Sequence, residues 1–198
     1  RKRQKFTKTM EQADILIEQF PHNLSFQAQK AIEVMQNGDH EESIRLLDKI
    51  LKKAPLDPNT LTAKGHAEKT LGKTNDAIKS YQTAYNSKHD HGEAYFSLAN
   101  LKTYKFDDEE IEQMKNQLKR VDISISDRTY FHFALAQACE DMSNYDEAFS
   151  QLDDGNHIRK NQTKYSIERM DEELQAQINI CNSQFFEDMG SGGNDTKE

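Results

Sequence analysis

The segment GDHEESIRLLDKILKKAP at residues 38–55 is followed 34 residues later by GKTNDAIKSYQTAYNSKH at residues 72–89, and residues of related kinds recur at matching positions. The pairs are Gly38 and Gly72, Ser43 and Ala77, Leu47 and Tyr81, and Ile50 and Ala84, and only Pro55, which matches His89, departs from the pattern. Self-similarity at a fixed period is the signature of a repeat protein, in which each unit packs against its neighbours along the chain.

The period of 34 residues is that of the tetratricopeptide (TPR) repeat, a pair of antiparallel helices. Two helices approach closely only where small residues meet at their crossing, and a large residue then fills the space beside them. Gly65 and Ala77 supply the small pair of one unit, and Tyr81 supplies the large residue. The sequence therefore predicts an all-α fold, a right-handed TPR superhelix of antiparallel helix pairs with a C-terminal capping helix.

The repeat frame assigns every part of the chain. Pro21 lies one period before Pro55, so residues 1–21 are expected to hold the second helix of an incomplete repeat. The segments that follow are regular TPR units at 24–57 and 58–91, an irregular unit at 92–128, a regular unit at 129–162, a capping helix at 163–189, and a flexible tail or linker at 190–198.

The third unit and the C-terminal segment depart from the regular pattern. The first helix of the third unit is expected at 92–104, but Phe106 stands where the frame requires glycine, and an acidic run follows at 107–110. Carboxylates stabilise the N-terminal end of a helix dipole, so this run predicts a new helix start. Residues 166–187 carry apolar side chains at spacings of three or four. That spacing predicts an amphipathic helix, which would cover the open end of the stack.

Composition narrows the class of function. The chain has 198 residues, 30% of them charged, and a net charge of −8, which argues against a general nucleic-acid binder. Basic residues cluster only at 1–8, where a solvated helix face and a contact with an anionic partner are both open. No apolar run approaches the ~20 residues of a membrane span, so no membrane partner is expected. Cys139 and Cys181 are too few for a disulfide framework or a cysteine zinc site, which fits a cytoplasmic protein.

No constellation of catalytic residues is recognisable. The glycine-rich C-terminal end lacks the spacing of a phosphate-binding loop. His89 and His91 alternate around a turn and could ligate a metal, but a turn in place of the repeat's proline is the simpler interpretation. Asp153, Asp154 and His157 share a helix without the spacing of a calcium loop. The sequence therefore predicts no catalytic residue, no metal and no cofactor in this chain, and no enzyme activity of its own.

The first helix of each TPR pair lines the concave side of the stack, where a peptide or a protein segment is expected to bind. Amide side chains there can bond an extended backbone, and aromatic side chains add contact area at little entropic cost. The predicted groove residues, which fall at inward positions of successive first helices, are His66, Lys69, Phe96, Asn100, Tyr104, Phe133 and Gln137. Ordinary exposed helix positions are the alternative for each of them. The inward Lys, Asn and Arg pattern of a chaperone-tail clamp is absent from this chain.

Two stretches go beyond a generic TPR pattern, GEAYFSLANLKTYKF at 92–106 and FHFALAQACEDMSNYDEAFSQLDDGNHIR at 131–159. They resemble the N-terminal TPR region of bacterial TPR–sulfotransferase proteins, in which runs similar to GEAYWSLANLKTFRF and HFALGKALEDLGDYDEAFAHYAEGNRLR occur. The resemblance is close over 92–160 and implies that the family shares the irregular third unit. In that family a helix with two Phe residues leads into a strand and a P-R-S-G-[ST]-T-type loop, which binds the sulfuryl donor PAPS.

Phe185 and Phe186 match that helix, but the sequence reaches Glu198 without such a loop. The resemblance therefore implies a TPR domain that positions an acceptor for a PAPS-dependent sulfotransferase domain, with 190–198 as the linker to that absent domain. Because the sequence does not begin with Met, we expect it to be a segment of a longer protein or a processed chain. The alternative is a free-standing TPR scaffold that recruits a protein partner without an attached enzyme.

Overall fold

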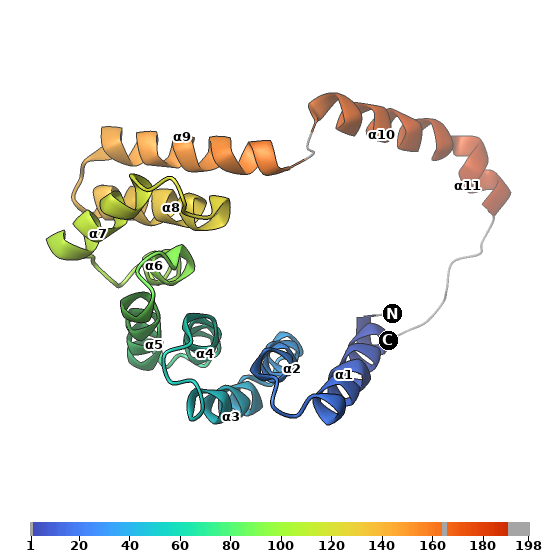
Figure 1. Cartoon of the computed structure of the whole chain (residues 1–198). Helices are drawn as coiled ribbons and strands as arrows, with labels where there is room; N and C mark the ends of the chain where they lie inside the picture. Colours follow the sequence, from blue (N-terminus) through green and yellow to red (C-terminus); the bar gives the residue numbers. More distant parts are fainter. Residues whose placement is uncertain (1, 164–165, 190–198) are drawn as a thin grey trace. The chain divides into compact units, whose positions relative to one another are not determined.

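The computed structural model describes residues 2–163 and 166–189, and every regular element among them is a helix. Eleven helices follow one another in these residues (Figure 1). The chain divides into two compact units, Arg1–Ile158 and Arg159–Glu198. The tail or linker expected at 190–198 lies outside the described residues.

Helices of the first unit pack against one another in chain order. The first five are α1 (Lys2–Gln19), α2 (Leu24–Gln36), α3 (His40–Leu51), α4 (Pro58–Thr70) and α5 (Thr74–Ser87). Each contacts the next, and α5 contacts α6 (Gly92–Ala99). The first helices of successive pairs, α2, α4 and α6, also contact one another in turn, and α3 and α5 lie on their outer side in Figure 1. The unit is thus a row of helix pairs stacked side by side.

Glycine ends the first helix of the first two regular pairs. The backbone angle φ is +97° at Gly38 and +74° at Gly72, a left-handed conformation that a residue without Cβ takes without strain. After Gly72 the N–H of Lys73 donates to the carbonyl of Glu68 over 2.9 Å, which satisfies a carbonyl in the last turn of α4. The recurring glycine therefore fixes where the chain reverses between the two helices of a pair.

The small and large residues of the repeat pattern form the core of the stack. Leu47 and Tyr81 are fully buried, and so are the small residues Ala31 and Ala77. The small residue Ser43 is also buried, and its hydroxyl donates a hydrogen bond of 2.8 Å to the carbonyl of Ala31. The polar side chain of Ser43 can therefore be buried where the two helices meet, because its hydroxyl forms a hydrogen bond to the other helix of the pair.

A buried carboxylate lies at the centre of the hydrogen bonds of the irregular third unit. The helix expected at 92–104 is shorter: α6 ends at Ala99, and Lys102 takes a positive φ of 62°. A loop then leads to α7 (Asp108–Leu118). Glu110 in the first turn of α7 is buried and accepts hydrogen bonds from the hydroxyls of Tyr85 and Tyr104. Tyr104 reaches this carboxylate from the loop between α6 and α7, beyond the end of the helix.

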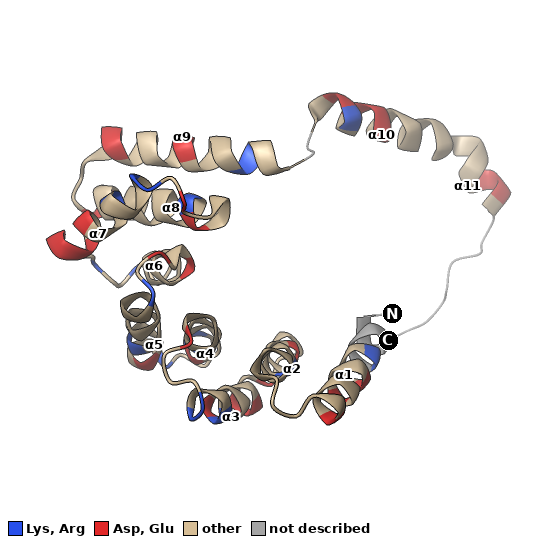
Figure 2. Ribbon diagram, in the orientation of Figure 1, with Lys and Arg blue, Asp and Glu red and all other residues tan. Residues whose placement is uncertain are grey.

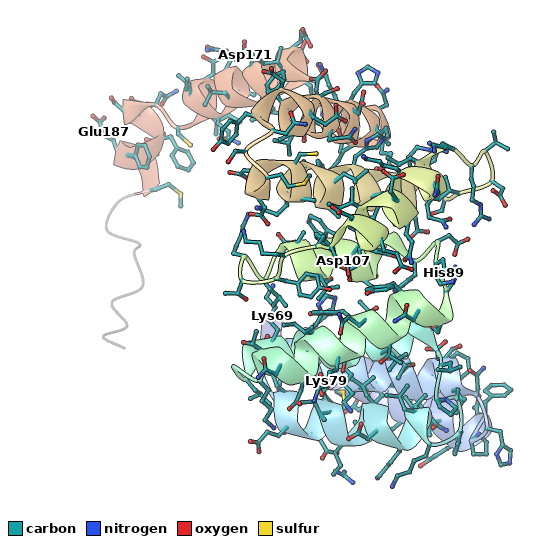
Figure 3. All side chains as sticks on the ribbon, turned by 90° about the vertical axis from the view of Figure 1, so that its left-hand side faces the viewer. Lys69, Lys79, His89, Asp107, Asp171 and Glu187 are labelled. Carbon is teal, nitrogen blue, oxygen red and sulfur yellow. The ribbon has the colours of Figure 1, made fainter. Side chains whose placement is uncertain are left out.

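The new helix start predicted from the acidic run is present. Asp107, labelled in Figure 3, accepts a hydrogen bond from the N–H of Glu110 over 2.8 Å, and Glu110 accepts one from the N–H of Asp107 over 3.1 Å. This reciprocal arrangement is a capping box, which satisfies two backbone donors at the helix start. The same glutamate thus begins α7 and joins it to α5.

The first unit continues with α8 (Ile125–Asp141), which packs against α6 and α7. The next helix is α9 (Tyr145–Gln162), whose last residues, from Arg159 on, belong to the second unit. Gly92 at the start of α6 lies against α8: its N–H donates to Asp127 over 2.9 Å, and a Cβ there would lie 2.6 Å from the carbonyl oxygen of Asp127. A residue without Cβ is therefore needed where the two helices meet.

The second unit contains α10 (Ile167–Ile180) and α11 (Ser183–Met189). Ser166 caps α10 by accepting a hydrogen bond of 3.2 Å from the N–H of Arg169. All residues of both helices are exposed within the unit. The capping role expected for 163–189 stays a prediction. Among the described residues, no helix combines the length and the apolar character required to cross a membrane.

Candidate functional site

A pocket of about 550 Å³ lies in the first unit, where α6, α8 and α9 meet. Its lining residues are Phe96, Ala99, Asn100 and Lys102 from α6 and the loop after it, Phe133, Ala136, Gln137 and Glu140 from α8, and Tyr145, Ala148, Phe149 and Leu152 from α9. We call this the aromatic pocket. Four of the seven predicted groove residues, Phe96, Asn100, Phe133 and Gln137, lie in it.

Aromatic rings form one wall of the aromatic pocket. The ring of Phe96 stacks on Tyr130, with centroids 5.2 Å apart, and lies 5.9 Å from the ring of Phe133. Gly155 on α9 lets Phe133 approach, because a Cβ at residue 155 would lie 2.8 Å from Cε1 of the Phe133 ring. The side of α9 that faces α8 therefore fixes the position of Phe133.

An apolar stripe on α9, which is not among the predicted groove residues, also lines the aromatic pocket. Tyr145, Phe149 and Leu152 are spaced four and three residues apart, and 66%, 72% and 43% of their surfaces are exposed. Large apolar side chains that gather on an exposed surface mark an interaction site more often than isolated ones do. A signal for this stripe was present in the sequence, since its spacing is that of one helix face.

The amides predicted to bond a peptide differ in their availability. Gln137 is engaged with neighbouring side chains: its Oε1 accepts a hydrogen bond from Lys102 Nζ, and its Nε2 donates to Asp141 over 3.1 Å. Asp141 also forms an ion pair with Lys105. Among the described residues, the side chain of Asn100 has no such partner, and it is exposed at the end of α6. Asn100 is therefore the available amide of the aromatic pocket.

Three of the predicted groove residues lie outside the aromatic pocket. His66 Nδ1 lies 3.0 Å from the hydroxyl of Tyr81, and His66 Nε2 lies 3.4 Å from Oε1 of Glu93. The hydrogen bond with His66 lowers the pKa of Glu93 below its usual value. Lys69, labelled in Figure 3, is exposed in the last turn of α4.

Tyr104, the third of these residues, is partly buried against the core. Its hydroxyl donates to Glu110 and accepts a hydrogen bond of 3.0 Å from Gln82. Burial, together with the hydrogen bond to Glu110, raises the pKa of Tyr104. Tyr104 therefore holds the loop after α6 in place rather than lining the pocket.

The alternating histidines considered as metal ligands are separated by their surroundings. His91 is buried, and its Nε2 lies 2.8 Å from the hydroxyl oxygen of Thr62, whereas His89 is exposed. Burial lowers the pKa of His91. In the described part of the chain, no group of three His, Cys, Asp or Glu residues is arranged to hold a metal ion. His91 thus joins the end of the second pair to α4.

Helix pairs that repeat every 34 residues, reverse at glycine and stack in chain order define a TPR protein, and the α-solenoid predicted from the sequence is confirmed. Within that class, the chain belongs to the family described as the N-terminal TPR repeats region of Psidin, whose model matches residues 2–131. No curated protein matches the sequence.

Solved structures of MamA are similar in fold. Two crystal structures of MamA, both 17% identical, have TM-scores of 0.55 and 0.54. They cover 83% and 84% of this chain and 95% and 90% of their own. A structure of MamA from residue 41 to its end, from Desulfovibrio magneticus RS-1, is 15% identical with a TM-score of 0.52, and covers 82% of this chain and 90% of its own. At this level of identity the likeness concerns the fold alone.

Proposed function

We propose that this chain is a protein-interaction domain that holds a peptide or protein segment at the aromatic pocket. The proposal rests on one observation: three helices line a single pocket, and the apolar residues at its rim are exposed. These rim residues are Tyr145, Phe149 and Leu152. The volume of about 550 Å³ falls within the range of ligand sites, roughly 300–1,000 Å³. A site of this size receives a few side chains of a longer segment rather than a whole domain.

The chemistry of the aromatic pocket favours an apolar or aromatic anchor beside a polar backbone contact. Rings such as Phe96 and Phe133 are held by their neighbours, so they bury area without losing much freedom on binding. Asn100 offers both a donor and an acceptor, which matches the two hydrogen-bonding groups of one peptide unit. A segment that inserts an apolar side chain next to α9 and bonds Asn100 through its backbone satisfies both features.

The finer part of the proposal is that the segment is an acceptor, positioned for a PAPS-dependent sulfotransferase domain. Its support is the resemblance of 92–106 and 131–159 to TPR–sulfotransferase proteins, and all the lining residues of the aromatic pocket fall within these two stretches. The alternative is a free-standing scaffold that recruits a partner without an attached enzyme. Support for that alternative is the family match over 2–131, which describes a TPR region.

A peptide-array screen followed by two substitutions tests the binding function. Asn100→Ala and Phe133→Ala should each weaken a selected peptide about tenfold or more, because each removes a contact made in a desolvated pocket. Asn86→Ala is the matched control, since Asn86 is exposed on α5, away from the aromatic pocket. Equal affinity for wild type, Asn100→Ala and Phe133→Ala, together with a loss in Asn86→Ala, would place the function on the outer helices.

A further inference from the structure

One residue of the stripe on α9, Leu152, occupies the same repeat position as residues that are buried in the earlier pairs. Leu152 takes the large position that Leu47 takes in α3 and Tyr81 takes in α5. Leu47 and Tyr81 are fully buried, whereas 43% of the surface of Leu152 is exposed. The difference lies in the neighbours: α3 contacts α4, and α5 contacts α6, the first helix of the following pair. Within the first unit, no helix follows α9.

The stacking of the earlier pairs indicates which kind of segment would cover the α9 stripe. In the earlier pairs, the first helix of the following pair packs against the second helix, which carries Leu47 or Tyr81. The α9 stripe presents an apolar surface at this place, with the large side chains of Phe149 and Leu152 exposed. An amphipathic helix therefore continues the stacking interface, whereas an extended segment covers only part of the stripe.

We infer that the segment bound at the aromatic pocket is an amphipathic helix of a partner protein, with Lys or Arg along one edge of its apolar face. This inference rests on the proposed function and adds the conformation and the charge of the ligand. Its apolar face covers Tyr145, Phe149 and Leu152, and its basic edge meets carboxylates that border the stripe.

The carboxylates that border the stripe are Asp146 and Asp153. They lie three residues before and four residues after Phe149, so all three share one side of α9. Acidic residues are visible along α9 in Figure 2. Asp146, Asp153 and the pocket residue Glu140 are all exposed, and none has an ion-pair partner among the described residues. A basic edge would pair with them on binding.

Charge also argues against the amphipathic helix of this chain as the ligand. The apolar stripe of α10, which includes Ile167, Met170 and Leu174, is bordered by Asp171 and Glu173. Carboxylates on a bound helix would face Asp146 and Asp153, and like charges that meet across an interface oppose binding. A second copy of the chain that docked through its own α10 would meet the same repulsion. The charge pattern therefore favours a helix with a basic edge over α10.

Two designed helical peptides of about 15 residues test the inference on the full chain. Both carry the same stripe of Leu and Ala, and they differ only in an edge of Lys or an edge of Glu. Fluorescence anisotropy measures affinity, and circular dichroism measures helix gained on binding. The Lys peptide should bind with a gain of helix and at least about tenfold more tightly than the Glu peptide. A third probe is a peptide of residues 166–181, the α10 sequence.

Variants tie the binding to the named residues. Phe149→Ala should weaken the Lys peptide about tenfold or more. The double change Asp146→Asn and Asp153→Asn should remove most of the preference for Lys over Glu. Val121→Ala is the control, because Val121 is an exposed apolar residue on the loop before α8. Equal or tighter binding of the Glu peptide or the α10 peptide overturns the inference, and so does binding of the Lys peptide without a gain of helix.

These measurements distinguish the conformation and charge of the ligand from the binding function itself. If the Lys peptide does not bind, but array peptides bind and lose affinity in Asn100→Ala, the inference of a basic helix is wrong and the proposed function stands. If no peptide of either kind binds, both are wrong.

Discussion

A Cβ added to Gly65 would lie 2.4 Å from Cε1 of the Tyr81 ring, closer than two carbon atoms can approach. Gly65 is in α4 and Tyr81 is in α5, so this contact sets the distance between the two helices of the second pair. Tyr81 is fully buried, and its hydroxyl is held by His66, so the ring has no room to withdraw. Glycine is needed at position 65 because it contacts the ring of Tyr81, and not only because it meets a small residue at the helix crossing.

Gly65→Ala should destabilise the protein by about 1–3 kcal/mol through overpacking. Alanine gains up to about 1 kcal/mol over glycine in helix propensity, which offsets part of this cost without reversing it. Thermal unfolding followed by circular dichroism measures the change. Lys69→Ala on the same helix is the control, because Lys69 is exposed and its change tests propensity without packing. A melting temperature of Gly65→Ala at or above that of wild type would contradict the close contact.

Local residue types predicted much of this fold, because the rules they follow are local. Gly38 and Gly72 mark the helix ends through their backbone conformation, and the acidic run at 107–110 marks the start of α7. The end of α6 at Ala99 was not predictable in the same way. The loop that follows Ala99 is held by hydrogen bonds to Glu110, whose carboxylate is buried only in the folded chain. One donor is Tyr104 in this loop, and the other is Tyr85, which is 25 residues from Glu110 in the sequence.

The candidate site shows the same division between local and distant causes. Phe96, Asn100, Phe133 and Gln137 fall at inward positions that can be counted from the period, and they do lie together. His66 has an equivalent position, but its ring nitrogens are engaged with Tyr81 and Glu93, 15 and 27 residues away. The α9 stripe was missed because its exposure depends on which helix lies next to it. The spacing of side chains in the sequence predicts which residues share one face of a helix, but the helix that packs against this face is known only from the folded structure.

Glu110→Ala should destabilise the protein by at least about 2 kcal/mol. The change leaves the hydroxyl of Tyr85, which donates to Glu110 over 2.6 Å, without its acceptor, and it removes half of the capping box of α7. Urea denaturation measures the free energy of unfolding. Glu112→Ala is the matched control on the same helix, since Glu112 is exposed and forms a surface ion pair with Lys115. Equal losses in the two variants would show that the buried carboxylate has no special role.

Stability should fall with decreasing pH because of His91. Its pKa is lowered from the usual 6.5 by burial, so below that value the unfolded chain binds a proton that the folded chain resists. Stability rises with pH wherever the unfolded state binds more protons, so this contribution is complete above pH 6.5 and is lost as the pH falls toward the lower pKa of the folded state. The melting temperature should therefore decrease from about pH 7 to pH 5.

The His91→Gln variant isolates this effect, because glutamine can still bond to Thr62 but does not titrate in this range. Its melting temperature should depend less on pH between about pH 7 and pH 5 than that of wild type. His157→Gln is the control at an exposed position of α9. If His91→Gln retains the full pH dependence of wild type, the buried imidazole is not its source.

The central claim, that the aromatic pocket binds a protein segment, is tested most directly by a tryptophan placed in its rim. The chain contains no Trp, so Phe149→Trp introduces a single reporter of nearly conserved shape. Addition of a peptide selected for binding should shift the emission of the introduced indole to shorter wavelength, because the ring becomes covered. A reporter on the loop before α8, Val121→Trp, should not respond. Binding of the peptide with a shift at residue 121 and none at residue 149 would contradict the account.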